Sequence, residues 1–297
     1  MSIKTFKSFI NEGGNAVKDS RIGRINQENV EGTMNDIYKK VLPLLNITKK
    51  DTGNLGSTGK KLPGGSSGDV DLAIDIHAVL RNNKNIKNVD DLFDKLVSIA
   101  KSLHMEYKDM RQMGLVSIGF PIHNTDGKQE GKLVQLDFMP TENLEYSKWA
   151  YYSPAEWESK WKGLYRNEVF YAIAKYMSFK VLKKAMDKEG KEVPVEWERN
   201  FFDLSKGLLK GTQTRMGKKG PVKTVKTISK EMVSMDAQEI VTMLFGPNYK
   251  PSDILTWEDI MKAIKSPKFI YKKNLPKIIK MVQDGISKKG YPVPEDL

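Results

Sequence analysis

The sequence predicts an α/β protein in which a mixed sheet with flanking helices is followed by a mainly helical C-terminal region. Apolar and polar residues alternate over residues 69–76, 116–120 and 134–138, and this period of two is typical of half-buried strands. Apolar residues recur at helical spacing over residues 30–44 and 92–103. Because the helix and strand patterns interleave along the chain, they favour one mixed α/β unit.

The patterns after the third predicted strand are mainly helical. Residues 165–188 form a long candidate helix. Asp236 with Glu239, and Thr256 with Asp259, have the spacing of residues that cap the first turn of a helix. The sequence therefore predicts a C-terminal region built from helices.

The composition excludes several kinds of site and favours an anionic partner. The 297-residue chain has no cysteine, which excludes disulfides, thiolate zinc sites and thiol nucleophiles. No apolar run approaches the roughly 20 residues that a membrane-spanning helix needs, so no membrane is expected as a partner. Lysine and arginine total 49 against 37 acidic residues, a net charge of +12. This excess favours nucleic acid as a partner, with solubility alone as the alternative.

The predicted strand at residues 69–76 carries aspartates on one face. Asp69 and Asp71 are two residues apart, roughly 6.6 Å along a strand, so their carboxylates share the face opposite the apolar residues. Asp137 alternates in the same way on a later strand and joins them if the two strands pair in a suitable register. Converging carboxylates favour bound hard cations and two-metal phosphoryl chemistry. For Asp-X-Asp alone, solvated strand residues are the simpler alternative.

A glycine-rich loop precedes this strand. Gly56 lets a backbone N–H approach a phosphate, and the Ser57 hydroxyl adds a donor. Lys60 and Lys61 could neutralise phosphate charge. The loop is not a P-loop, because that motif needs glycine where Asn54 stands and serine or threonine where Lys61 stands. We therefore expect a different kind of phosphate-binding loop.

The loop and the strand together resemble the DNA polymerase beta-like nucleotidyltransferase superfamily. Leu55-Gly56-Ser57, a spacer and Asp69-Val70-Asp71-Leu72 match its signature, and Asp137 resembles its third metal carboxylate. The resemblance covers roughly residues 26–140. It implies a mixed sheet flanked by helices, a nucleoside triphosphate substrate and attack by an acceptor hydroxyl. It also implies two Mg²⁺ ions, with Mn²⁺ as an alternative, held by the three catalytic aspartates.

Two later segments could complete such a site. The resemblance implies that the region after the sheet holds the nucleotide, so Tyr151 or Tyr152 could stack on the base and Arg166 could reach a phosphate. Core packing is the alternative for these side chains. Residues 206–230 contain no acidic residue and are predicted to form a loop or hairpin that binds a nucleic-acid backbone, or a solvated loop. The cationic residues of this segment are Lys206, Lys210, Arg215, Lys218, Lys219, Lys223, Lys226 and Lys230.

The N-terminus has a separate resemblance. MSIKTFKSFINE is similar to the capsid-targeting leaders of internal proteins in large tailed bacteriophages, which are cut after Ile or Leu, any residue and Glu. Ile10-Asn11-Glu12 fits this pattern, and an ordinary amphipathic helix is the alternative. We therefore expect a mobile leader over residues 1–25, a catalytic domain over 26–150 and a mainly helical nucleotide- and acceptor-binding region over 151–297. A cytoplasmic protein, packaged in a virion if the leader is genuine, fits these features.

The sequence thus favours an enzyme that moves a nucleoside monophosphate from an NTP or dNTP to the 3′ end of RNA, or of DNA. One alternative is transfer to a protein or a small molecule, which needs the same site without a polyanion surface. Another is a non-catalytic nucleic-acid-binding virion protein. Oligomeric state, base preference and acceptor identity stay open.

Overall fold

A computed structural model describes residues 16–124, 126–186, 190–215 and 225–297. The chain divides into two compact units, Met1–Lys160 and Trp161–Leu297. Residues 151–160 therefore belong to the first unit, although the predicted boundary follows residue 150. The candidate leader cleavage site, Ile10-Asn11-Glu12, lies outside the described residues.

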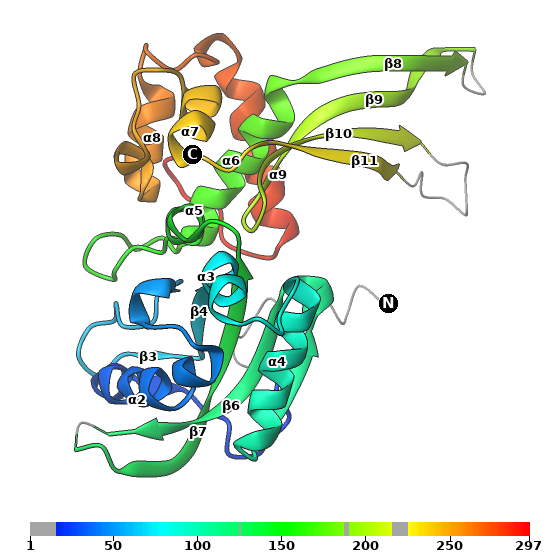
Figure 1. Ribbon diagram of the computed structural model, residues 1–297. Coiled ribbons are helices and arrows are strands. Elements are labelled where there is room, and N and C mark those ends of the chain that lie inside the picture. The colour runs from blue at the N-terminus through cyan, green and yellow to red at the C-terminus, as the bar shows by residue number, and fades with distance from the viewer. Residues whose placement is uncertain (1–15, 125, 187–189, 216–224) are drawn as a thin grey trace. The chain divides into compact units, whose positions relative to one another are not determined.

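The first unit is built on a five-stranded mixed sheet, which confirms the predicted mixed α/β architecture (Figure 1). Its strand order is β2-β4-β7-β6-β5, and β4 and β7 are parallel while the other neighbours are antiparallel. The strands are β2 (Thr52–Asn54), β4 (Asp69–Asp75), β7 (Gln129–Thr141), β6 (Leu115–His123) and β5 (Tyr107–Met110). The helices of this unit are α2 (Gln27–Lys40), α3 (Ile76–Asn82), α4 (Val89–Ser102) and α5 (Leu144–Ala150).

One face of this sheet forms the core. Val70 and Leu72 of β4 and Phe138 of β7 are buried together with apolar residues of α2 and α4. The alternation of β4 leaves its odd-numbered residues on the other face. Asn88 caps α4 by accepting from the backbone N–H of Asp91 at 2.9 Å. The core therefore fixes which side chains of β4 and β7 point away from it.

Residues 16–26 are packed against the first unit rather than forming a separate leader. Short strand β1 (Ile25–Asn26) pairs with β3 (Ser66–Ser67), and Ile22 forms a bridge with Leu133 of β7. The backbone N–H of Ala16 donates to the Gln135 side chain at 2.7 Å. The predicted leader boundary at residue 25 is therefore wrong for residues 16–25, because their side chains and backbone contribute to the sheet and its core.

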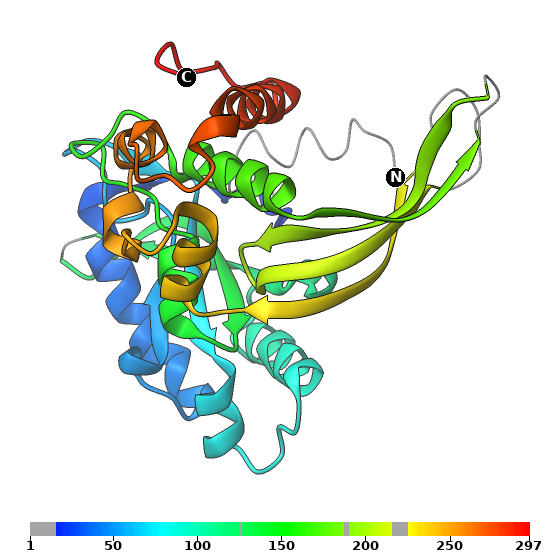
Figure 2. The same ribbon diagram turned by 90° about the horizontal axis from the view of Figure 1, so that it is seen from above.

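The second unit corrects the expectation of a mainly helical C-terminal region. It contains a four-stranded antiparallel sheet of order β11-β10-β9-β8, which extends away from its helices (Figures 1 and 2). Its elements are α6 (Gly163–Met177), β8 (Phe179–Met186), β9 (Glu192–Asp203), β10 (Gly207–Arg215), β11 (Val225–Ser234), α7 (Ala237–Phe245), α8 (Trp257–Lys265) and α9 (Leu275–Lys288). The five 3₁₀ helices of the described chain are η1 (Leu42–Leu45), η2 (Lys49–Asp51), η3 (Arg111–Met113), η4 (Pro251–Ile254) and η5 (Lys272–Asn274).

The predicted helix at residues 165–188 ends at Met177, and the chain then pairs as a strand with β9. The lysine, leucine, alanine and methionine residues of β8 are good helix formers. Pairing with β9 therefore overrides the local helix propensity of this segment. The predicted starts of α7 and α8 are correct. Asp236 accepts from the N–H of Glu239, and Thr256 forms a capping box with Asp259. In the described part of the chain, no helix combines the length and apolar composition needed to cross a bilayer.

Candidate metal centre

Three aspartates of the first unit converge at the paired strands β4 and β7. Asp71 lies directly beside Asp137 in the parallel register, and Asp69 lies two residues earlier on the same face of β4. Each carboxylate offers an oxygen within 4.8 Å of those of the other two. The register that the sequence left open therefore brings Asp137 to the Asp69–Asp71 pair.

The electrostatics of this cluster are unfavourable without a cation. Burial, together with the negative charges of Asp69 and Asp137, raises the pKa of Asp71 well above its usual range. Burial and the charge of Asp69 raise the pKa of Asp137 to about 6, against the opposing effect of hydrogen bonding from Ser117 and Gln135. Oxygen ligands of this kind suit Mg²⁺ or Mn²⁺. The donor set therefore fits a hard divalent ion, which would relieve the repulsion.

Gln135 supports this cluster, and sequence reasoning missed it. Its side-chain N–H group donates to both oxygens of Asp137, at 2.9 and 3.1 Å. Its amide oxygen accepts from Ala16, so the segment before β1 helps to orient it. Ser117 of β6 lies on the other side of Asp137 in the antiparallel register. The available signal was the position of Gln135, two residues before Asp137 and thus on the same strand face.

The glycine loop lies against the carboxylates. The N–H of Leu55 donates to the carbonyl of Asp71 at 2.9 Å, and the Thr58 hydroxyl donates to the carbonyl of Asp69 at 2.7 Å. Gly56 has a φ of +65°, and a Cβ added there would lie 2.9 Å from Oδ2 of Asp71. Glycine is thus required by both backbone conformation and space. Ser57 follows at the start of a turn, where its carbonyl accepts from Lys60.

Lys60 and Tyr152 are brought together next to this loop. The Lys60 ammonium lies 4.4 Å from the centre of the Tyr152 ring and donates to the carbonyl of Ser153 at 2.9 Å. Burial lowers the pKa of Lys60. The Tyr152 hydroxyl donates to Glu158, and Tyr151 accepts from the N–H of Gly56. One side of the Tyr152 ring is therefore occupied by Lys60.

Two other predicted nucleotide ligands, Lys61 and Arg166, have partners within their own units. Lys61 forms an ion pair with Glu156 at 3.2 Å, so its charge is compensated. Arg166 is 1% exposed in the second unit, where its Nε donates to the carbonyl of Ile254 at 3.0 Å and its guanidinium lies over Phe170. The burial of Arg166 favours core packing, the alternative that the sequence offers for this side chain, over a contact with phosphate.

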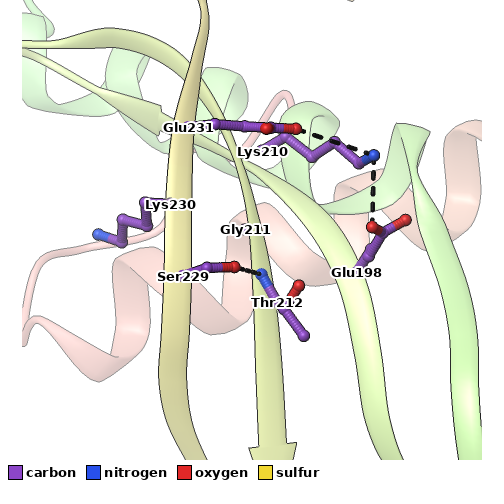
Figure 3. Close-up of a pocket in the computed structure, with 7 residues that line it drawn as sticks. All are labelled: Glu198, Lys210, Gly211, Thr212, Ser229, Lys230 and Glu231. Atoms are coloured by element: carbon purple, nitrogen blue, oxygen red, sulfur yellow. Dashed lines mark hydrogen bonds and ion pairs between the residues drawn. The ribbon is translucent and has the colours of Figure 1, made fainter.

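The predicted nucleic-acid segment is a pair of antiparallel strands, β10 and β11, whose connection over residues 216–224 lies outside the described residues. Lys218, Lys219 and Lys223 fall within that connection. Lys210 lies in a shallow pocket with Glu198 and Glu231, whose carboxylates are 3.4 and 4.0 Å from its ammonium (Figure 3). Lys210 is therefore compensated, while Lys206, Lys226 and Lys230 are exposed and Arg215 is half-buried.

Among known proteins, no family model matches this chain, and the curated proteins contain no match to it. Its function therefore has to be argued from the site itself.

The aspartate cluster predicts a metal-dependent gain in stability. Mg²⁺ should raise the unfolding temperature of the wild-type protein, because a ligand that binds only the folded state stabilises it. In EDTA, Asp71→Asn should unfold above the wild type, by roughly 2–4 °C for each kcal/mol of repulsion removed. Thermal unfolding in EDTA and in excess Mg²⁺ measures both effects. Equal responses of the wild type and Asp71→Asn to Mg²⁺ would argue against a metal centre at these residues.

Proposed function

We propose that the protein is a metal-dependent nucleotidyltransferase of the polymerase beta-like kind, which moves a nucleoside monophosphate from an NTP or dNTP to an acceptor hydroxyl. The observation that carries the proposal is the convergence of Asp69, Asp71 and Asp137 within 4.8 Å, directly against a Gly-Ser loop. A structural carboxylate cluster would not require a glycine whose missing Cβ leaves space next to Asp71. The combination favours a site that binds metal and phosphate together.

In the proposed reaction, the acceptor oxygen attacks the α-phosphorus of the nucleotide. A new oxygen–phosphorus bond forms, the bond between the α-phosphorus and the bridging oxygen to the β-phosphate breaks, and pyrophosphate leaves. The proton of the acceptor hydroxyl passes to solvent water. Divalent ions held by Asp69, Asp71 and Asp137 would neutralise charge on the phosphates and on the attacking oxygen. Gly56 lets the loop lie close to the Asp71 carboxylate, Ser57 next to it offers a hydroxyl donor to the phosphates, and Tyr152 is the candidate stacking partner of the base.

The net charge of +12 favours RNA as the acceptor over a protein or a small molecule. Transfer to a protein hydroxyl remains the second candidate, because Lys210 and Lys61 are both compensated by glutamates and the cationic surface is smaller than the sequence suggests.

Incorporation of labelled nucleotide tests the proposal directly. The protein should transfer label from an α-phosphate-labelled NTP to single-stranded RNA in the presence of Mg²⁺, and should not transfer label from the γ-phosphate. DNA and protein from a cell lysate serve as alternative acceptors, and a reaction in buffer alone is the control. Label on protein instead of RNA would establish the second candidate. Absence of transfer to every acceptor, with all four NTPs and dNTPs supplied, would favour a non-catalytic nucleic-acid-binding protein.

A further inference from the structure

The two faces of the second-unit sheet differ in chemistry. One continuous row of cross-strand partners runs from Phe179 of β8 through Arg199 and Gly211 to Lys230 of β11. Directly paired residues share a face of a sheet, and so do residues two apart on a strand, which adds Phe201. We call the surface formed by Phe179, Arg199, Phe201 and Lys230 the Phe201 face.

The opposite face is electrically compensated. Lys210 lies between Glu198 and Glu231, and Lys184 forms an ion pair with Glu192 at 2.7 Å. Figure 3 shows Lys230 directed away from the side that carries Lys210 and Glu198. Acidic residues of the described strands thus compensate Lys184 and Lys210 on this face, which lowers its net charge.

On the Phe201 face, an aromatic ring lies between two cations. The ring of Phe201 has the Arg199 guanidinium 5.1 Å and the Lys230 ammonium 5.3 Å from its centre. Gly211 makes this possible, because a Cβ there would lie 3.0 Å from Cε2 of Phe201. Packing of an aromatic ring across a glycine stabilises a sheet but does not require cations on both sides. The two charges therefore need another explanation.

Neither cation has an acidic partner in the part of the chain that the structure describes. No ion pair joins Arg199 or Lys230 to a carboxylate there, and the buried Nε of Arg199 has no hydrogen-bond partner among the described residues. Burial lowers the pKa of Arg199, and this guanidinium also lowers the pKa of Lys175 at the end of α6. Asp284 is the acid that opposes this effect at Lys175, and it pairs with Lys280. The guanidinium of Arg199 is thus uncompensated by any carboxylate of the described residues, and an uncompensated guanidinium suits a phosphate.

An exposed aromatic side chain completes the row. Phe179 is 56% exposed and lies next to Arg199, with the ring of Trp197 beside it on the same face at a ring-centre distance of 6.2 Å. Trp197 is buried, and its Nε1 donates to Gln213 at 3.2 Å, so the position of the Trp197 ring is fixed. An exposed ring next to Arg199, in a row that ends at Lys230, combines a stacking surface with two cations, as in sites that bind unpaired bases and their phosphates.

We propose that the Phe201 face binds single-stranded RNA, with backbone phosphates at Arg199 and Lys230 and a base stacked on Phe179. The choice of RNA rests on the proposed function, in which RNA is the acceptor. A single strand fits better than a duplex, because bases within a duplex cannot stack on a protein ring. The same side of the sheet then supplies both the charge and the stacking surface.

Fluorescence anisotropy tests this proposal. It measures the binding of a labelled single-stranded RNA of about 12 nucleotides to the full chain over a range of salt concentrations. The double variant Arg199→Gln, Lys230→Gln should reduce the slope of log K against log salt by about 1.4, which is two phosphate contacts at about 0.7 each. Phe179→Ala should weaken binding about tenfold while leaving the slope unchanged. Lys210→Gln, on the compensated face, is the matched control and should leave both affinity and slope unchanged.

Circular dichroism verifies that each variant is folded. If Arg199→Gln disturbs the sheet, Lys230→Gln alone, at an exposed position, should still lower the slope by about 0.7. Equal losses in Lys210→Gln and in the Phe201-face variants would overturn the proposal, as would duplex RNA binding as tightly as the single strand. The assay contains no nucleotide, so it is independent of catalysis. Loss of binding in these variants with no transfer in any assay would retain this proposal and reject the proposed function.

Discussion

Replacing Asp71 with asparagine is expected to reduce nucleotide transfer by about 10³-fold or more, because metal-ion catalysis supplies several kcal/mol and each 1.36 kcal/mol is tenfold in rate. Asparagine keeps the shape of the side chain and removes its charge. Asp71 is central to the cluster, since both neighbouring carboxylates raise its pKa. Asp69→Asn and Asp137→Asn should have effects of the same order. Steady-state transfer rates at saturating Mg²⁺ measure the losses.

Asp75→Asn is the matched control for this series. Asp75 lies at the end of the same strand and on the same face, but its carboxylate caps α3 by accepting from the N–H of Ala78 at 3.2 Å. Asparagine caps helices equally well, so activity should be unchanged. Full activity in any of the three cluster variants, or an equal loss in Asp75→Asn, would contradict the assignment of the metal ligands.

Replacing Gly56 with alanine is expected to lower transfer by about 10²-fold, the cost of a displacement of about 1 Å within a catalytic site. The added Cβ would lie 2.9 Å from Oδ2 of Asp71, so either the loop or the carboxylate has to move. The affinity for the Mg²⁺–nucleotide complex should fall with the rate. Titration with a fluorescent nucleotide, together with the rate at saturating nucleotide, separates these two effects.

Gly59→Ala controls for backbone strain in the same loop. Gly59 also has a positive φ, +81°, so alanine costs about 1–2 kcal/mol of conformational energy at either position. Its Cβ would meet only Val30, at an ordinary distance of 3.6 Å. Both variants should therefore lose stability, while only Gly56→Ala should lose nucleotide affinity. Equal affinities in the two variants would remove Gly56 from the site.

The sequence predicted most of the first unit because its signals are local. Strict alternation at Asp69, Asp71 and Asp137 identifies a strand face directly, and only the register of β4 and β7 had to come from the structure. The roles of Gln135 and Ala16 depend on a contact between residues more than a hundred positions apart. No local pattern encodes such a contact.

The second unit was harder to predict because its strands lack a clear period. β8 is exposed along almost its whole length, so its residues carry no alternating burial that would distinguish a strand from a helix. Arg166 could not be placed from the sequence either. Nothing in its sequence neighbourhood indicates that its Nε donates a hydrogen bond to the carbonyl of Ile254 inside a core. The cationic segment at 206–230 was predicted to be a loop or a hairpin, and its described residues lie in two paired strands. The neutralisation of Lys210 depends on Glu198 of a third strand.

The most direct test of the metal centre is anomalous diffraction from crystals soaked with Mn²⁺ and a non-hydrolysable nucleotide. We expect Mn²⁺ density in contact with carboxylate oxygens of Asp69, Asp71 and Asp137, with the triphosphate beside Gly56 and Ser57. Two-metal chemistry predicts a second ion about 3.5–4 Å from the first. Well-ordered carboxylates with no anomalous density between them, at Mn²⁺ concentrations that support transfer by this protein in solution, would contradict the assignment of the metal centre.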